Sequence, residues 1–423
     1  MAEELKNIET KNIDHLGLVA GVCEEIGLIA LIDKLTQSDE QRTVSVGTAT
    51  QAMILNGLGF TNRTLYLTPN FFKDKAIDVL LGDDISANDL NSHSLGTALD
   101  RLWEWGLSRI FFNVALKAIK TYGIAINSRH LDGTTFMVHG NSYAEGGELI
   151  GQIELNRGYN KQKRNDLRQF VVEMISANVE GIPLFMKTAS GNKTDKTEFP
   201  DVLEAYVAQM KEADEDMSGY TVADSALYSE ENLDRLQAIK WISRVPETLK
   251  QAKSELRAYA TRSWKNFEDA SGYKYAEVSS SYGGLAQRWL IVWSAQAEKR
   301  STKTVSKQVS KEKANLEKGI KGLKKTAYST EQQAEQAVQD WYGKQLKKSQ
   351  KRYHSLGKLS IVQRAHWGRG RRKANAVPLR VDYQLKSVEL IEDESVVKDT
   401  IRQKAQFILA TNDTNKDNLS VDE

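Results

Sequence analysis

The sequence has almost no cysteine and no long apolar run, and both shortages narrow what the chain can be. Cys23 is the only cysteine, which excludes an intramolecular disulfide framework and a CxxC zinc site. It lies in an apolar helical pattern that predicts core packing. No stretch of 18 or more residues is apolar, so we expect no membrane-spanning helix. The first residues, MAEELKNIETKNID, lack the basic and then apolar pattern of a signal segment. These features predict a cytoplasmic protein without a membrane partner.

The composition is that of a soluble globular protein with several domains. The 423 residues are 40% hydrophobic and 27% charged, which is ordinary for folded domains and argues against global disorder. A chain of this length has room for two to four domains.

The net charge of +2 hides an uneven distribution. Residues 341–373 contain eleven Lys or Arg and no Asp or Glu, so the remaining residues sum to −9. A positive block on an otherwise acidic chain suggests a polyanionic partner such as nucleic acid. A solvated charged face explains the same charges equally well.

Residues 1–125 are predicted to form a helical, DNA-binding domain. Apolar residues recur at helical spacing in 16–35, 46–58 and 108–122. Residues 86–105 predict two short helices with a polar turn at 91–94. This arrangement resembles a helix-turn-helix, although any three-helix bundle shows the same pattern.

Residues 126–250 predict the first part of an α/β core. Strand patterns lie at 129–140, 168–177, 184–190, 219–227 and 241–247. Helical patterns lie between the last three of them, at 198–213 and 229–240. Three strands, a helix, a strand, a helix and a strand form the order of an RNase H-like fold, in which antiparallel strands precede parallel ones. We therefore predict the α/β class, with an RNase H-like mixed sheet.

The pattern becomes less regular beyond residue 250. Residues 273–294 predict a hairpin, 296–350 predict charged helices, and 377–391 and 404–412 predict strands.

Two aspartates carry the sharpest chemical signal. Asp132 in HLDGTTF and Asp224 in VADSALYS each lie at or near an apolar strand. The first and fourth strands of an RNase H-like sheet are neighbours, so the two carboxylates are expected to meet. Adjacent carboxylates repel unless a cation lies between them, and a pair of Mg²⁺ ions supplies that cation and activates an oxygen nucleophile against a phosphodiester. Alternatively, either aspartate caps a turn or a helix.

A series of motifs resembles one family from about residue 85 to the end of the chain. The segments HLDGTTFMVHG, GYNKQKRNDLRQF, SGNKTD, VADSALYSEENL, WISRVP, QRWLIVWS and FILATND follow one another in the order found in bacterial insertion-sequence DDE transposases of the cut-and-paste type. Each motif is short, but seven in the right order are specific. The resemblance implies that Asp132 and Asp224 are Mg²⁺ ligands, with Mn²⁺ as a substitute.

The family has a third acidic ligand, a Glu on a helix that follows the strand resembling FILATND, within a Tyr/Arg/Glu/Lys signature. The sequence ends at Glu423 without that signature, so we expect the final helix to be missing and metal binding to be weak. The resemblance also implies that residues 251–400 form a mixed α+β insertion domain containing the basic segment. Residues 401–423 are then the return strand of the core.

Further candidate residues are of the kind that contacts DNA. Tyr159, Lys161 and Arg164 lie in the GYNKQKRNDLRQF motif, where the cations could neutralise phosphates and the tyrosine could pack on a sugar or base; a plain surface loop is an equal alternative. Arg369, Arg371 and Arg372 lie beside Trp367 in HWGRGRRK, a mixture suited to a DNA backbone.

The sequence predicts a transposase that cuts and rejoins DNA at insertion-sequence ends by metal-dependent phosphodiester chemistry, and it implies a homodimer on paired ends. The competing hypothesis is a truncated, non-catalytic DNA-binding remnant that inhibits the full-length enzyme. An unrelated RNase H-like nuclease fits the motif order less well.

Overall fold

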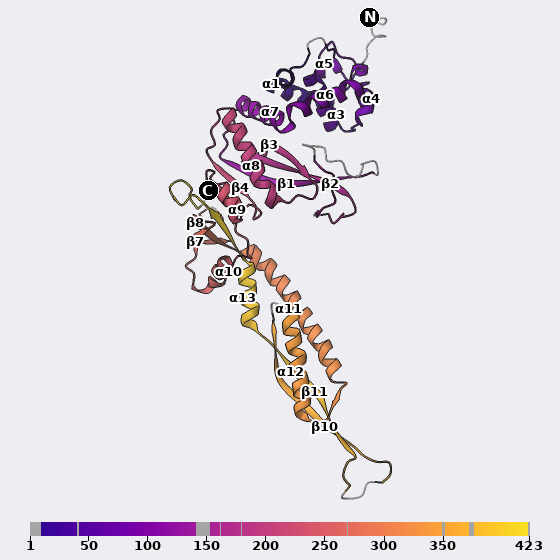
Figure 1. Cartoon of the computed structure of the whole chain (residues 1–423), viewed down its shortest axis with the longest axis vertical. Coiled ribbons are helices and arrows are strands. Elements are labelled where there is room, and N and C mark those ends of the chain that lie inside the picture. Colours follow the sequence, from indigo (N-terminus) through magenta and orange to yellow (C-terminus); the bar gives the residue numbers. More distant parts are fainter. Residues whose placement is uncertain are drawn as a thin grey trace. The chain divides into compact units, whose positions relative to one another are not determined.

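A computed structural model of the chain forms two compact units (Figure 1). Unit 1 contains residues 1–243 and 281–285, and unit 2 contains residues 244–280 and 286–423. The structure describes residues 10–39, 42–140, 153–160, 162–178, 180–268, 270–348, 352–371 and 376–421.

Unit 1 begins with a helical region, as the sequence predicts. Its helices are α1 (Leu16–Ile26), α2 (Leu28–Thr36), α3 (Val46–Leu58), η2 (Leu65–Leu67), α4 (Thr68–Phe72), α5 (Ile77–Leu81), η3 (Ala87–Asp89), α6 (Ser92–Trp105) and α7 (Leu107–Tyr122). The single helix expected over 16–35 is two helices, because Gly27 adopts a left-handed conformation with φ 71° that ends α1.

One apolar core holds these helices together, and Cys23 packs within it as predicted. Burial raises the pKa of the Cys23 thiol. The polar turn expected at 91–94 is instead a helix start, because the Asn91 side chain accepts hydrogen bonds from the backbone N–H groups of His93 and Ser94. None of the helices in the described ranges is long and apolar enough to cross a bilayer.

The rest of unit 1 is a mixed sheet with helices. The strands are β1 (Ser128–Val138), β2 (Arg168–Ala177), β3 (Ile182–Ser190), β4 (Tyr220–Ala223) and β5 (Trp241–Arg244), and the helices are α8 (Asp195–Glu212) and α9 (Glu230–Arg235). The strands lie in the order β3-β2-β1-β4-β5. β2 is antiparallel to both of its neighbours, β1 and β3, whereas β4 is parallel to both β1 and β5. The expected mixed α/β architecture is therefore confirmed.

The α8 helix covers one face of this sheet. From β1, the buried Arg129 donates a hydrogen bond from Nε to the Tyr206 hydroxyl of α8, at 3.3 Å. The Tyr206 ring also packs against Phe112 of α7 and Phe185 of β3, and burial raises the pKa of its hydroxyl. Because side chains alternate along a strand, the intervening residues of β1, including Asp132, lie on the opposite face.

Unit 2 contains a smaller group of strands and a long helical hairpin. Its elements are α10 (Lys250–Arg257), η4 (Ala258–Thr261), β6 (Lys265–Asn266), β7 (Tyr273–Tyr282), β8 (Leu285–Ser294), α11 (Ala295–Leu323), β9 (Ala327–Tyr328), α12 (Glu331–Lys348), β10 (His354–His366), β11 (Arg380–Glu392), α13 (Glu394–Lys404) and β12 (Gln406–Thr411). Four strands lie in the order β12-β8-β7-β6, and a separate three-stranded sheet has the order β10-β11-β9. The hairpin predicted over 273–294 is present as β7 and β8.

The α11 and α12 helices pack closely at one glycine. A Cβ atom added to Gly319 of α11 would lie 2.3 Å from Cζ2 of Trp341 in α12. Both helices share an apolar cluster with β10 and β11 that includes Ile320, Val338 and Leu385. Gly319 therefore allows the approach of the two helices, whereas a Cβ on Gly322 in the same helix would meet nothing within 4 Å.

Gly319→Ala should destabilise unit 2 by about 1–3 kcal/mol, because the added methyl group overlaps a rigid indole ring. Gly322→Ala is the matched control and should stabilise α11 by about 0.5–1 kcal/mol, since alanine is the better helix former. Hydrogen exchange of the α11 amides measures both effects locally. Equal protection in the two variants would contradict the close packing.

Candidate functional site

The two predicted aspartates lie at equivalent positions beside each other, Asp132 within β1 and Asp224 directly after β4. β1 and β4 pair in parallel with Leu131 opposite Ala223, so Asp132 is the next residue of β1 and Asp224 follows directly after the end of β4. Neighbouring strands lie about 4.8 Å apart, and residues in register point to the same face. Leu131 and Ala223 are buried on the α8 side, whereas both aspartates are exposed. The pairing thus brings two carboxylates to one exposed face of the sheet.

Local hydrogen bonds hold each carboxylate. Asp132 Oδ1 accepts from the backbone N–H of Gly133 at 2.9 Å, and Asp224 Oδ1 accepts from the N–H of Ala226 at 2.7 Å. Asp224 therefore caps a turn through Oδ1, as the alternative interpretation of this residue predicts. Within the described ranges Oδ2 of Asp224 has no hydrogen-bond partner, so capping leaves this oxygen available for a ligand.

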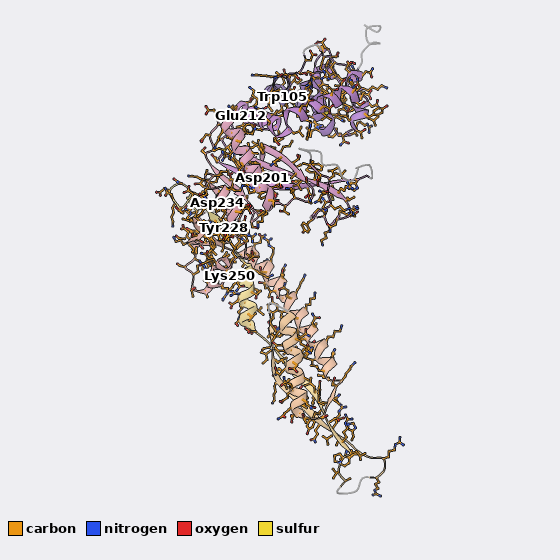
Figure 2. All side chains as sticks on the ribbon, in the orientation of Figure 1. Trp105, Asp201, Glu212, Tyr228, Asp234 and Lys250 are labelled. Carbon is orange, nitrogen blue, oxygen red and sulfur yellow. The ribbon has the colours of Figure 1, made fainter. Side chains whose placement is uncertain are left out.

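The segment after Asp224 is fixed from several sides. The Asp224 carbonyl accepts a hydrogen bond from the Ser243 hydroxyl of β5 at 2.8 Å. Tyr228, which Figure 2 labels, is buried, meets the Trp241 ring edge-on and stacks on Tyr282. Ser229 then caps α9 by accepting from the Asn232 N–H. The VADSALYS motif is thus a rigid turn that orients Asp224.

The described residues supply two carboxylates for a cation but not a third. No group of three or more His, Cys, Asp or Glu side chains that could hold a metal occurs among them. Glu173 pairs with Gly133 across β1 and β2 and is buried, so it lies on the α8 face, opposite Asp132. Asp413, in unit 2, already accepts hydrogen bonds from the Asn415 N–H and the Asn418 side chain. Two oxygen-bearing side chains on one face suit a hard divalent ion, although they form an incomplete ligand set.

An aromatic pair shares the exposed face with Asp132, and the sequence motifs did not single it out. Phe136 of β1 lies opposite Phe170 of β2, and their rings stack with centroids 5.3 Å apart and planes inclined by 12°. The Phe136 side chain is 48% exposed, which leaves ring surface that a nucleobase could stack on.

The loop that contains Tyr159 is held in place by hydrogen bonds of two buried side chains. The buried Gln169 donates from Nε2 to the carbonyls of Gly191 and Tyr159 at 2.8 and 3.2 Å. Asn160, also buried, donates to Gln169 Oε1 at 3.2 Å. A Cβ on Gly158 would lie 2.2 Å from the Gly191 carbonyl. We call Gln169, Asn160 and the two carbonyls the Gln169 clasp; it joins the GYNKQKRNDLRQF and SGNKTD motifs.

The clasp presents Tyr159 to solvent, with 86% of its side chain exposed. Arg164 forms a two-pronged ion pair with Asp166, and this guanidinium lowers the pKa of Asp166 to about 2. Lys161 lies outside the described residues. Along β2, Gln169 is five residues from Met174, the partner of Asp132, which is about 17 Å at the strand rise. The loop and the carboxylates are therefore separate contact points.

The basic segment of unit 2 ends in the loop between β10 and β11. Arg369 and Arg371 are exposed there, while Arg372 lies outside the described residues. Near them, Arg380 and His366 both contact Asp382, and these contacts lower the pKa of Asp382, that of Arg380 most. Val377 and Leu379 are also largely exposed, at 84% and 78%. The end of this hairpin therefore combines cations with apolar surface.

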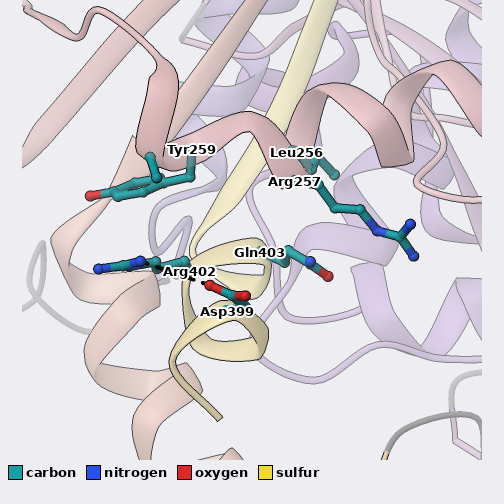
Figure 3. A pocket seen from close by; sticks show the side chains of 7 residues that line it. Leu256, Arg257, Tyr259, Asp399, Arg402 and Gln403 are labelled. Carbon is teal, nitrogen blue, oxygen red and sulfur yellow. Dashed lines mark ion pairs between the residues drawn. The ribbon is translucent and has the colours of Figure 1, made fainter. Parts of the chain in front are cut away.

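A small pocket lies between α10, η4 and α13 (Figure 3). Its volume is about 270 Å³. Arg402 lies over the ring of Tyr259 at 5.4 Å and pairs with Asp399 at 3.8 Å. The Arg402 side chain therefore already has partners within the protein, and ligand sites are generally larger than this pocket. The pocket is not assigned a function.

The comparisons with known proteins match parts of the chain. Residues 8–116 match a family described as "Domain of unknown function (DUF4277)", which covers most of the helical region. No curated protein matches the sequence.

Two solved transposase structures are weakly similar. The piggyBac transposase synaptic complex with hairpin DNA is 10% identical, with a TM-score of 0.27 over 64% of this chain and 49% of that one. The Mos1 transposase paired-end complex with the left transposon end is 11% identical, with a TM-score of 0.19 over 49% of this chain and 76% of that one. The chain thus spans about half the length of the piggyBac protein, and likeness of this degree determines neither fold nor function.

Gln169→Ala should destabilise unit 1 by about 1–3 kcal/mol, because it leaves buried carbonyls without their donor. It should also open the Tyr159 loop to trypsin at Lys163 and Arg164. Gln162→Ala, at an exposed position of the same loop, is the control and should change neither property. Denaturant unfolding and limited proteolysis provide the two measurements, and an unaltered cleavage rate in Gln169→Ala would argue against the clasp.

Proposed function

We propose that the chain is a transposase-type DNA-processing protein whose unit 1 contains an RNase H-like core, with Asp132 and Asp224 as its metal ligands. The observation that carries the proposal is the register of β1 and β4, because it makes these aspartates neighbours on one exposed face. The strand order β3-β2-β1-β4-β5 supports the RNase H-like assignment. The ordered series of motifs supports the transposase assignment.

Asp132 and Asp224 would hold Mg²⁺ or Mn²⁺, which when bound activates an oxygen nucleophile against a phosphodiester. The chain's own groups have other tasks. The turn behind Asp224 keeps that carboxylate in position. The stacked Phe136 and Phe170 rings offer a platform for a base, and the loop held by the Gln169 clasp gives Tyr159 access to the nucleic acid several nucleotides away.

A second candidate function is a DNA-binding protein that does not cleave. The incomplete ligand set favours it, because in-line attack on phosphorus depends on a fully coordinated metal pair. Both candidates share DNA as partner, and we extend the proposal to a homodimer acting on two DNA ends. They differ in whether the two carboxylates bind a metal and whether the protein nicks DNA.

The effect of Asp132→Asn and of Asp224→Asn on the unfolding temperature should depend on whether divalent ions are present. Without them, each variant should unfold at the same temperature as the unmodified chain or higher, because the change removes carboxylate repulsion. Adding Mg²⁺ or Mn²⁺ should stabilise the unmodified chain and neither variant. Thermal unfolding in EDTA and in each metal ion measures both effects.

Asp234→Asn is the control for lost charge, since Asp234 is exposed on α9, where Figure 2 labels it. It should respond to metal like the unmodified chain. A metal response that persists in Asp132→Asn would sink the ligand assignment. Metal-dependent nicking of duplex DNA by the unmodified chain selects the enzyme, whereas metal-independent DNA binding without nicking selects the non-cleaving alternative.

A further inference from the structure

We infer that the outward face of α11 is a binding surface for the sugar–phosphate backbone of duplex nucleic acid. This inference rests on the proposed function in one respect, because it names a surface for the same DNA partner. The surface is distinct from the basic segment at 341–373 and from the two aspartates.

Six cations of α11 lie in one row. At 3.6 residues per turn they fall within an arc of about 80° on the helix, and all six are exposed: Arg300, Lys303, Lys307, Lys311, Lys318 and Lys321. We call this set the α11 basic row. The buried residues of the helix, including Val305, Val309 and Leu316, lie on the opposite side.

The acidic residues of α11 lie outside this row. Glu298 and Glu312 lie on the buried side, and Glu312 accepts hydrogen bonds from the backbone N–H groups of Tyr353 and His354. Glu317 lies beyond the edge of the arc. The folded helix therefore separates charges that are mixed along the sequence.

The cations of the row form no ion pair with any described residue. No carboxylate among those residues lies within ion-pair distance of its five lysines, and Arg300 bonds only to the Gln296 side chain. A helix face that merely contacts water usually alternates its charges, as α13 does where Lys398 pairs with Glu394. In α11 the i,i+4 neighbours of Lys307 are both lysines, which costs helix stability. A polyanionic partner would offset this repulsion.

The dimensions of the row favour a duplex. Arg300 and Lys321 are 21 residues apart, about 32 Å along a helix, which is close to the 34–36 Å of one duplex turn. The helix packs closely against α12 at Gly319. An anionic membrane fits less well, because an interfacial helix buries large apolar side chains and none of those on α11 is exposed.

The test compares two triple variants of the full chain that remove equal charge. Lys303, Lys307 and Lys311 are changed to Gln in one, and Lys120, Lys211 and Lys398 in the other, which are exposed lysines outside the row. Fluorescence anisotropy with a duplex DNA follows affinity across a series of salt concentrations. If the three lysines contact phosphates, the slope of log affinity against log salt should flatten by about two to three units. The control slope should stay unchanged.

Each outcome decides the inference. An unchanged slope in the α11 variant, or equal flattening in the control, overturns it and leaves the proposed function standing. Lysine-dependent binding to phosphatidylserine vesicles without any effect on DNA binding overturns it in favour of a membrane. If the unmodified chain fails to bind DNA at the lowest salt, both proposals fail. If α11-dependent DNA binding persists while the aspartate variants respond to metal normally, only the proposed catalytic site fails.

Discussion

The parallel pairing of β1 with β4 controls what unit 1 presents on its exposed sheet face. Leu131 and Ala223 are buried opposite each other, and burial of apolar side chains under α8 favours this register over its alternatives. A slip of one residue would turn every side chain of the strand to the other face. Core packing therefore keeps Asp132 and Asp224 next to each other although their charges repel, and the free energy of folding maintains this candidate site.

Elements with a strong periodic signal were predictable from the sequence. The boundaries expected for 46–58 and 168–177 agree with α3 and β2, because caps and strict alternation mark them. The helix expected over 16–35 failed at Gly27, where backbone freedom overrides the apolar pattern. β10 and α13 were not predicted. β10 carries cations among half-buried residues, and α13 is mostly polar, so neither shows a clear apolar period.

Residues of the candidate site were predictable from the sequence only where a single short motif contains the residue. Asp132 and Asp224 each lie at or near an apolar strand, so sequence order alone suggested that they meet. The Phe136–Phe170 stack depends on the pairing of two strands, and the Gln169 clasp depends on a contact with Gly191. The α11 basic row was hidden for a different reason. Glu residues interrupt it in the sequence, and only the helical phase removes them from its face.

The Gln169 clasp also affects which mutations the Tyr159 loop can accept during evolution. Its hydrogen bonds use main-chain carbonyls of Gly191 and Tyr159 together with the inward-facing Asn160. None of them depends on the outward side chains of Arg157 or Tyr159. The loop can therefore exchange its outer residues while keeping its shape, so mutation could alter what it contacts without a loss of stability. Such a loop separates the evolution of recognition from the maintenance of the fold.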